Sequence, residues 1–207
     1  MIDLRELGPG DEESLLRIYS AESTQYLGRA PMDADEARYR LRDIMAAAAQ
    51  SPRTLYVLGL AVDGDLLGIV KLHHDRPLAA VSYILRADAW GRGYATEGVR
   101  RLLALAFDHL GLPEVRAKHS PDNPASGRVL RKAGFALTGE RNGFMTYAIR
   151  VPAQTGRPSA PPARPEPAVE RALLEHVIKL ADTALDVGDV PALAAAPRAM
   201  ELSAPPG

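Results

Sequence analysis

The chain has 207 residues, of which 46% are hydrophobic and 25% charged, and its formal net charge is −1. This length and composition are typical of one globular domain with an appendage. There is no cysteine, which excludes disulfides, thiolate metal sites and a cysteine nucleophile. The charged first residues and the lack of a long apolar run predict a cytoplasmic protein with no signal peptide and no membrane partner.

The first half of the chain predicts a strand, two helices and three further strands. The evidence is alternating apolar residues, helix caps at Asp11 and Asp33, and β-branched runs. In chain order, we expect a strand at 2–7, helices at 11–19 and 33–50, and strands at 54–62, 66–74 and 78–85. Asp63-Gly64 separates the two middle strands, and this dipeptide favours the turn of a β-hairpin.

The second half alternates helices and strands. Apolar periodicity predicts, in chain order, a helix over 93–110, a strand over 115–119, a helix over 124–133 and strands over 135–139 and 144–151. Together with the first half, this order predicts an α/β fold in which a central mixed β-sheet is flanked by helices. We assign residues 1–151 to this domain.

The composition changes after residue 151. Residues 152–167 contain six prolines among Ala, Gly, Ser and Arg, which predicts an extended linker. Residues 168–203 carry apolar side chains at near-heptad spacing and predict a helical hairpin extension, followed by a disordered end at 204–207. Two interpretations of the hairpin stay open: it packs on its own domain, or it forms a homodimer or binds a partner protein.

The segment Trp90-Gly91-Arg92-Gly93-Tyr94 is the most informative part of the sequence. An apolar strand ends before it, and an amphipathic helix begins directly after it. The glycines let the backbone turn tightly, and the amides of the first helical turn then point at an anion. This order predicts a phosphate-binding turn. The alternatives are a dinucleotide fingerprint, which would need glycine where Thr96 stands, and a turn with no ligand.

The charges are distributed unevenly along the chain. Residues 86–150 contain eleven Lys and Arg against six Asp and Glu, whereas residues 1–50 contain six against ten. The basic excess thus lies on the segment with the glycine turn, as a polyanionic cofactor would require. A nucleic-acid-binding protein would show a larger basic excess, so nucleic acid is not an expected partner. An uneven scatter of surface charge would give the same counts.

The segment Asn123-Pro-Ala-Ser126 has a structural and a functional interpretation. Asn is a preferred helix cap and Pro suits the first helical position, so Asn123 is expected to cap a helix. A capping side chain also lies at the mouth of its helix, where the arm of a cofactor would pass. The two interpretations are compatible.

These two segments, followed by Leu130-Arg-Lys-Ala-Gly134-Phe135, resemble the GNAT acyl-CoA-dependent N-acetyltransferases, in particular the branch with the ribosomal-protein N-terminal acetyltransferases. The resemblance covers roughly residues 2–150. It implies acetyl-CoA as co-substrate and no metal. It also implies that the pyrophosphate is held by a run of backbone amides: those of Gly91, Arg92, Gly93, Tyr94, Ala95 and Thr96.

The resemblance assigns the rest of the cofactor site as well. Backbone groups near Leu85 and Arg86 would pair with the pantetheine arm like an added strand. An amide there would hold the thioester oxygen as it becomes an oxyanion. Asn123 would hold the cofactor arm, and Ser126 would donate a proton to the departing thiolate.

The general base is not evident. The branch often carries Glu-Gly after the Gly-Phe turn, and that glutamate can act as the base, but here the pair is Thr138-Gly139. His73 and His74 are adjacent in a predicted strand, so one of them faces the substrate side. An imidazole pKa of about 6.5 suits removal of a proton from an ammonium group. An ordinary strand histidine is the other interpretation of each, and Glu22, Tyr26 and Tyr83 are weaker candidate bases.

The sequence therefore predicts an enzyme that moves an acetyl group from acetyl-CoA to a primary amine by direct attack. The acceptor would be a peptide N-terminus or a small aminated metabolite or antibiotic. Residues 8–50 would wall the acceptor side, and their acidic excess would steer a cationic amine. The alternatives are a catalytically weakened acyl-CoA-binding module that regulates or binds a partner, and a toxin-like transferase that acts on aminoacyl-tRNA.

Overall fold

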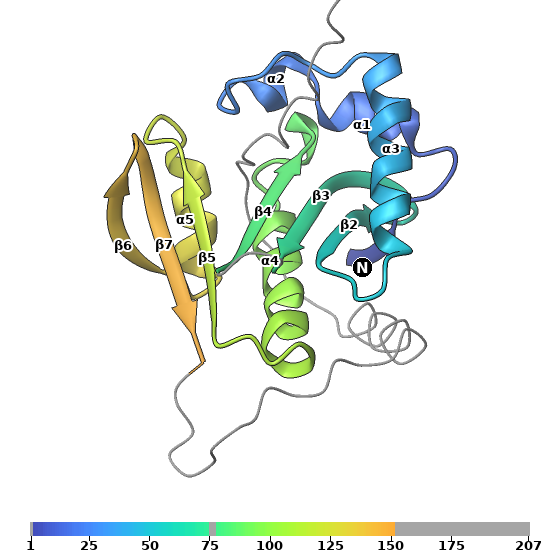
Figure 1. Cartoon of the computed structure of the whole chain (residues 1–207). Coiled ribbons are helices and arrows are strands. Elements are labelled where there is room, and N and C mark those ends of the chain that lie inside the picture. Colours follow the sequence, from blue (N-terminus) through green and yellow to red (C-terminus); the bar gives the residue numbers. More distant parts are fainter. Residues whose placement is uncertain (1, 75–77, 152–207) are drawn as a thin grey trace, which may run out of the picture.

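The computed structural model describes residues 2–74 and 78–151 and contains one mixed sheet (Figure 1). The strands lie in the order β1-β2-β3-β4-β5-β7-β6. Their bounds are β1 Ile2–Glu6, β2 Leu55–Val62, β3 Asp65–His73, β4 Ala79–Leu85, β5 Glu114–His119, β6 Ala136–Arg141 and β7 Phe144–Arg150. Only β4 and β5 run parallel to each other; every other neighbouring pair is antiparallel. The predicted α/β fold with a mixed sheet is confirmed.

Helices cover both faces of this sheet (Figure 1). They are α1 Glu12–Ile18, α2 Ala21–Thr24, α3 Ala34–Ala48, the 3-10 turn η1 Ala87–Ala89, α4 Tyr94–Ala104, the π-helical η2 Leu105–His109 and α5 Pro124–Lys132. The helices α1 and α3 pack on one face, and α4 and α5 on the other. None of the helices within the described ranges is long and apolar enough to cross a membrane.

The two faces of the sheet bury separate apolar clusters. Under α4 and α5, β4 contributes Tyr83 and Leu85; under α1 and α3, it contributes Ile84. Successive side chains of a strand point to opposite faces, so a single strand supplies both clusters. Strand β4 is therefore central, and it links the two faces on which cofactor and acceptor are expected.

Strands β4 and β5 pair only where they begin. Ala79 pairs with Val115 and Ala80 with Arg116, and no further pair joins the two strands. Strand β3 stays paired with β4 as far as Leu85, and β7 stays paired with β5 along its length. The sheet therefore opens into a gap after Ala80, and the two strands diverge in Figure 1.

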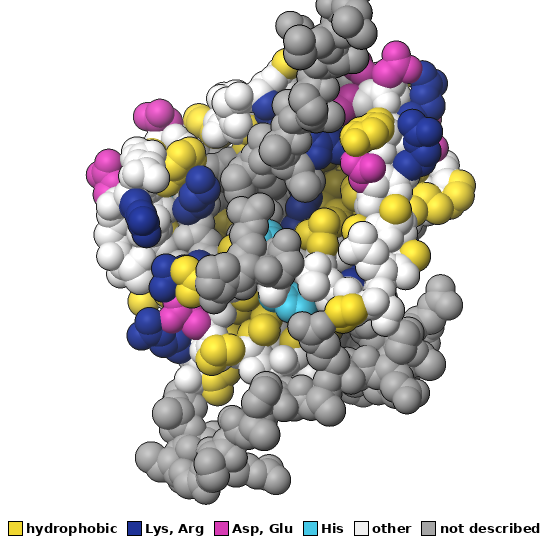
Figure 2. All heavy atoms as spheres, viewed as in Figure 1, with side chains coloured by type: hydrophobic (Ala, Val, Ile, Leu, Met, Phe, Trp, Pro, Cys, Tyr) yellow, Lys and Arg dark blue, Asp and Glu magenta, His cyan; other side chains and the backbone are white. Residues whose placement is uncertain are grey.

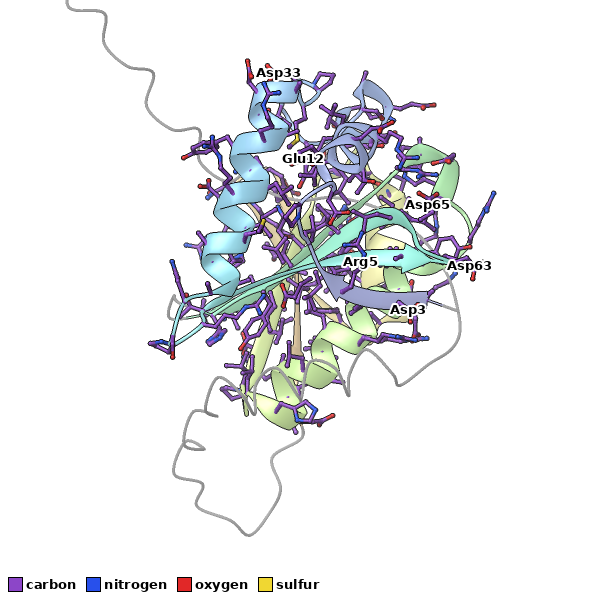
Figure 3. The ribbon with its side chains drawn as sticks, turned by 90° about the vertical axis from the view of Figure 1, so that its right-hand side faces the viewer. Asp3, Arg5, Glu12, Asp33, Asp63 and Asp65 are labelled. Carbon is purple, nitrogen blue, oxygen red and sulfur yellow. The ribbon has the colours of Figure 1, made fainter. Side chains whose placement is uncertain are left out.

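The predicted caps behave differently from each other. At the start of α3 (Figure 3), the carboxylate of Asp33 accepts a hydrogen bond from the Glu36 amide at 2.8 Å, as expected. Asp11 precedes α1 but makes no side-chain cap. Its carboxylate instead accepts two bonds from Arg5 on β1, at 2.6 and 2.8 Å, and the resulting charge pair lowers the pKa of Asp11. An ion pair with the preceding strand has replaced a bond within the helix, which periodicity cannot reveal.

Three local expectations need adjustment. The short helix α2 was not predicted, because the Ser20 side chain that caps it is followed by only one helical turn. The helix expected over 93–110 changes to π-helical bonding in η2. Strand β3 ends at His73, so His74 lies just outside it. The predicted linker 152–167, hairpin 168–203 and end 204–207 lie outside the described residues.

Candidate active site

The glycine turn leads from the end of β4 into α4. Gly91 and Gly93 have φ values of 76° and 93°, a left-handed conformation that other residues rarely adopt. Gly93 is the N-cap of α4, and no side chain caps the helix there. The amides of the first turn, which begins at Tyr94, therefore form the mouth of an uncapped helix, where a helix dipole favours an anion. The structure places the predicted phosphate turn at the open end of the β4–β5 gap.

Arg86 ties this turn to the sheet. Its guanidinium bonds Asp88 within η1, at 2.7 and 2.9 Å, and both carboxylate oxygens of Asp65 at 2.9 Å. Asp65 lies at the start of β3 (Figure 3). These bonds raise the pKa of Arg86 and lower that of Asp88. The side chain of Arg86 thus has a structural role, and any contact with a cofactor would come from backbone groups nearby.

The hydrogen-bonding direction of β4 shows which backbone groups face the gap. The Arg86 amide donates to the Leu67 carbonyl on β3 at 2.9 Å. Because this direction alternates along a strand, the amides and carbonyls of Val81, Tyr83 and Leu85 point the other way, towards β5. The Leu85 carbonyl already accepts a bond from the Trp90 indole at 3.1 Å. Leu85 and Arg86 were both predicted to pair with the pantetheine arm. Leu85 borders the gap, whereas the Arg86 amide is bonded to β3.

Asn123 and Ser126 start α5 on the far side of the gap. The Asn123 side chain accepts the Ser126 amide at 3.1 Å, so the predicted cap is present. The Ser126 side chain is fully buried, and its hydroxyl shares a 2.9 Å hydrogen bond with the Tyr83 hydroxyl from β4. A pair of hydroxyls thus links strand β4 to the start of helix α5. Sequence reasoning placed Tyr83 only among weaker candidate bases, because the Tyr83–Ser126 contact spans 43 residues.

A second buried pair supports the start of α5. The Nδ1 atom of His119 donates to the Ser120 carbonyl at 2.6 Å, and its Nε2 atom lies 3.2 Å from the Tyr147 hydroxyl. Both rings are almost fully buried. Gly127 packs directly against them, since a Cβ there would lie 2.7 Å from His119 Nε2 and 3.1 Å from the Tyr147 hydroxyl.

Gly127→Ala is expected to displace the start of α5, because the added methyl meets a ring on β5 and a hydroxyl on β7. Overpacking of this kind costs roughly 1–3 kcal/mol of unfolding free energy. Chemical denaturation measures this loss, and a fall in turnover should accompany it because Ser126 adjoins the displaced residue. Gly143→Ala is the control: its added methyl meets nothing within 4 Å, though its φ of 76° carries backbone strain. Equal turnover in the two variants would contradict the expectation.

The two histidines lie at the closed end of the gap. His73 pairs with Ala80 on β4, where the β4–β5 pairing stops, and strand alternation puts its side chain on the α1–α3 face. His74 donates its amide to the Thr54 carbonyl at 3.0 Å, and its ring stacks on Tyr56 at 5.9 Å. It also lines a pocket with Leu78 and Glu114 at the end of β4 remote from the glycine turn. We expected one of these histidines to face the acceptor side, and of the two it is His73 whose side chain lies on the α1–α3 face.

Thr138 stands where the resemblance has a glutamate. Its hydroxyl bonds that of Thr146 on β7 at 3.0 Å, in an exposed part of β6. The β6 register shifts at this point, with Gly139 at φ 132°. Within the described ranges, no group of three His, Asp or Glu side chains is arranged to hold a metal ion.

The comparisons with known proteins agree with this arrangement. Residues 2–136 match the family described as acetyltransferase (GNAT) domain. The uncharacterized N-acetyltransferase YoaA of Bacillus subtilis (strain 168) is 28% identical over 149 residues, which span 69% of this chain and 83% of that protein.

Two solved structures share the fold. The ribosomal L7/L12 alpha-N-protein acetyltransferase RimL, solved with coenzyme A, has a TM-score of 0.62 at 18% identity, with 72% of this chain and 94% of that chain covered. The spermidine N-acetyltransferase of Vibrio cholerae, solved with CoA and spermine, has a TM-score of 0.60 at 19% identity, with 72% and 95% covered. The resemblance inferred from the three motifs is confirmed, and the chain is an acetyltransferase of the GNAT family.

Proposed function

We propose that this protein transfers the acetyl group of acetyl-CoA directly to the nitrogen of a primary amine. One observation carries the proposal: an uncapped helix mouth at the glycine turn opens onto a gap between two parallel strands. A diphosphate fits the first feature, and an extended amide-containing arm fits the second. Family membership supplies the donor, since RimL and the spermidine enzyme were both solved with coenzyme A.

The chain's own groups would hold the donor in order along the gap. Amides from Gly91 to Thr96 would bind the pyrophosphate. The β4 edge from Val81 to Leu85 would pair with the pantetheine arm, because its backbone groups face the gap. An amide of that edge would then stabilise the oxyanion that develops on the thioester oxygen. Asn123 would border the arm from the start of α5, where it caps the helix.

Two proton transfers complete the reaction. As the amine nitrogen bonds to the acetyl carbon, the carbon–sulfur bond breaks, and the departing thiolate needs a proton. Ser126 would donate that proton, and its bond to the Tyr83 hydroxyl would supply the replacement. The amine would lose protons on the α1–α3 face of the sheet, where His73 of β3 lies. Ser126 and His73 thus lie on opposite faces of the sheet, on either side of the gap.

The test combines donor binding with turnover. Calorimetry with acetyl-CoA should show saturable binding, and release of free thiol should depend on an added primary amine. His73→Gln should lower kcat/KM at neutral pH by roughly 100-fold, the usual effect of losing a general base. His109→Gln, at the end of η2, is the matched control.

Each contrary result has a distinct meaning. Donor binding without turnover on any amine would overturn the enzymatic proposal and favour the acyl-CoA-binding module. Unchanged turnover in His73→Gln would remove His73 as the base while leaving acetyl transfer intact. Growth arrest on expression would instead favour the transferase acting on aminoacyl-tRNA.

A further inference from the structure

The face of the sheet beneath α1 and α3 contains a buried lysine. Lys71 lies in the middle of β3 and is only 6% exposed. Its neighbours on its own face are apolar except one: Ile69 lies on β3 and Val57 on β2, whereas the buried Ser82 pairs with it on β4. Lysine is almost never buried at this level without an anionic partner. Across residues 2–74 and 78–151, however, Lys71 forms no ion pair.

Lys71 stands beside the reacting end of the gap. It pairs with Ser82 on β4, two residues beyond the last β4–β5 pair at Ala80. Strand alternation puts the Lys71 side chain on the same face as that of His73 and on the opposite face from Tyr83. An amine that approaches the thioester from the α1–α3 face therefore meets Lys71 close to the acetyl group.

A second cation lies against the same aromatic ring. The Nζ atom of Lys71 is 6.0 Å from the centroid of the Tyr19 ring, and the guanidinium carbon of Arg29 is 5.0 Å from it. Arg29 pairs with Glu36 at 2.6 Å, and Glu36 also accepts a bond from Arg40 at 3.3 Å. Glu36 thus contacts two cations, and Lys71 is not one of them. Figure 2 shows both Lys and Arg side chains (dark blue) and Asp and Glu side chains (magenta) on the surface around α3.

Neither of the two carboxylates at the start of α3, Asp33 and Glu36, pairs with Lys71. Glu36 is already bonded to two arginines, and Asp33 accepts the amide that caps α3. The excess of acidic residues over 8–50 predicted steering of a cationic amine, but the charged side chain buried beneath α1 and α3 is that of Lys71, a cation. The arrangement of the side chains, rather than their count, decides which acceptor is favoured.

We propose that Lys71 and Arg29 bind a negatively charged group, a carboxylate or a phosphate, on the acceptor amine. The inference rests on the proposed acetyl transfer and names the acceptor class: an anionic amine such as an amino acid or short peptide, rather than a polyamine. A buried ammonium forms strong charge-assisted hydrogen bonds with such a group. The same charge opposes a second ammonium on the acceptor, which excludes polyamines.

The test compares paired acceptors that differ only in the anionic group. Glycylglycine is compared with glycylglycinamide, and O-phosphoethanolamine with ethanolamine, with rates expressed per concentration of neutral amine. The wild-type protein should favour the anionic member of at least one pair by tenfold or more in kcat/KM, mainly through KM. The carboxylate pair and the phosphate pair then distinguish the two sources of charge.

Substitution of the two cations should remove this preference. Lys71→Met keeps the buried aliphatic stem without the charge. It should reduce the ratio of kcat/KM for the anionic acceptor to that for its neutral counterpart to within twofold. Arg29→Gln, in a loop, should reduce it by a smaller factor and serves if the first variant does not fold. Arg38→Gln is the control, because Arg38 pairs with Asp35 on the exposed surface of α3 and should keep the full ratio.

The possible failures are distinguishable. Turnover without preference in the wild-type protein, or a preference for spermidine, would overturn the anion subsite and leave acetyl transfer standing. A preference that persists in folded Lys71→Met and Arg29→Gln would also overturn it. Absence of both acetyl-CoA binding and thiol release would instead refute the proposed function itself.

Discussion

Gly93→Val should lower the affinity for acetyl-CoA by roughly 100-fold, equivalent to about one charge-assisted hydrogen bond. Gly93 has a φ of 93° at the N-cap of α4, where the valine side chain is strongly disfavoured. The backbone would relax away from this conformation and turn the first amides of α4 from their common direction. Calorimetric titration with acetyl-CoA measures the loss directly.

Gly64→Val is the matched control for this experiment. Gly64 has a φ of 84° in the β2–β3 turn, and a Cβ there would meet nothing within 4 Å. The two variants carry a similar backbone penalty and should both lose stability. Only Gly93→Val should lose affinity for acetyl-CoA. Equal affinities in both variants would show that the glycine turn does not hold the diphosphate.

Ser126→Ala should lower kcat by roughly 100-fold, the lower range for loss of a general acid. The affinity for acetyl-CoA should change little, because the helix cap uses the backbone amide of Ser126 and the side chain of Asn123. Tyr83→Phe removes the partner hydroxyl at 2.9 Å and should have a similar effect on kcat. Single-turnover kinetics with a saturating donor measure both.

The double variant distinguishes a functional pair from two independent contacts. Groups that act as a unit are not additive, so Ser126→Ala with Tyr83→Phe should be little slower than either single variant. Tyr147→Phe is the control, since it deletes another buried hydroxyl, bonded to His119 Nε2, from the same side of the sheet. It should lose stability with a far smaller effect on kcat. Full activity in Ser126→Ala would assign the proton donor elsewhere.

Local features of the site were largely predictable. Asp63 and Gly64 form the expected hairpin turn, with φ values of 51° and 84°. Gly91 and Gly93 take the left-handed conformations that the phosphate turn requires, and Asn123 caps α5. Each of these depends on a few adjacent residues, whose steric and hydrogen-bonding preferences the sequence states directly.

Long-range features were harder to predict. The base candidates His73 and His74 looked equivalent, but β3 ends between them, and only His73 faces α1 and α3. Lys71 was not considered, although a lysine within the apolar segment Leu-Leu-Gly-Ile-Val-Lys-Leu-His is a signal that could have been used. Its importance comes from Tyr19 and Arg29, which are distant in sequence and meet it only when α1 packs on β3.

By itself, the sequence determined the order of the strands and of the helices other than α2, the glycine turn and the GNAT family. Only the tertiary structure decided where β4 and β5 separate, which hydroxyl lies against Ser126 and which charged side chain is buried beneath α1 and α3. The physical reason is the range of the interactions. Turn and cap preferences act over a few residues, whereas strand divergence and buried charge depend on what the packed sheet brings together.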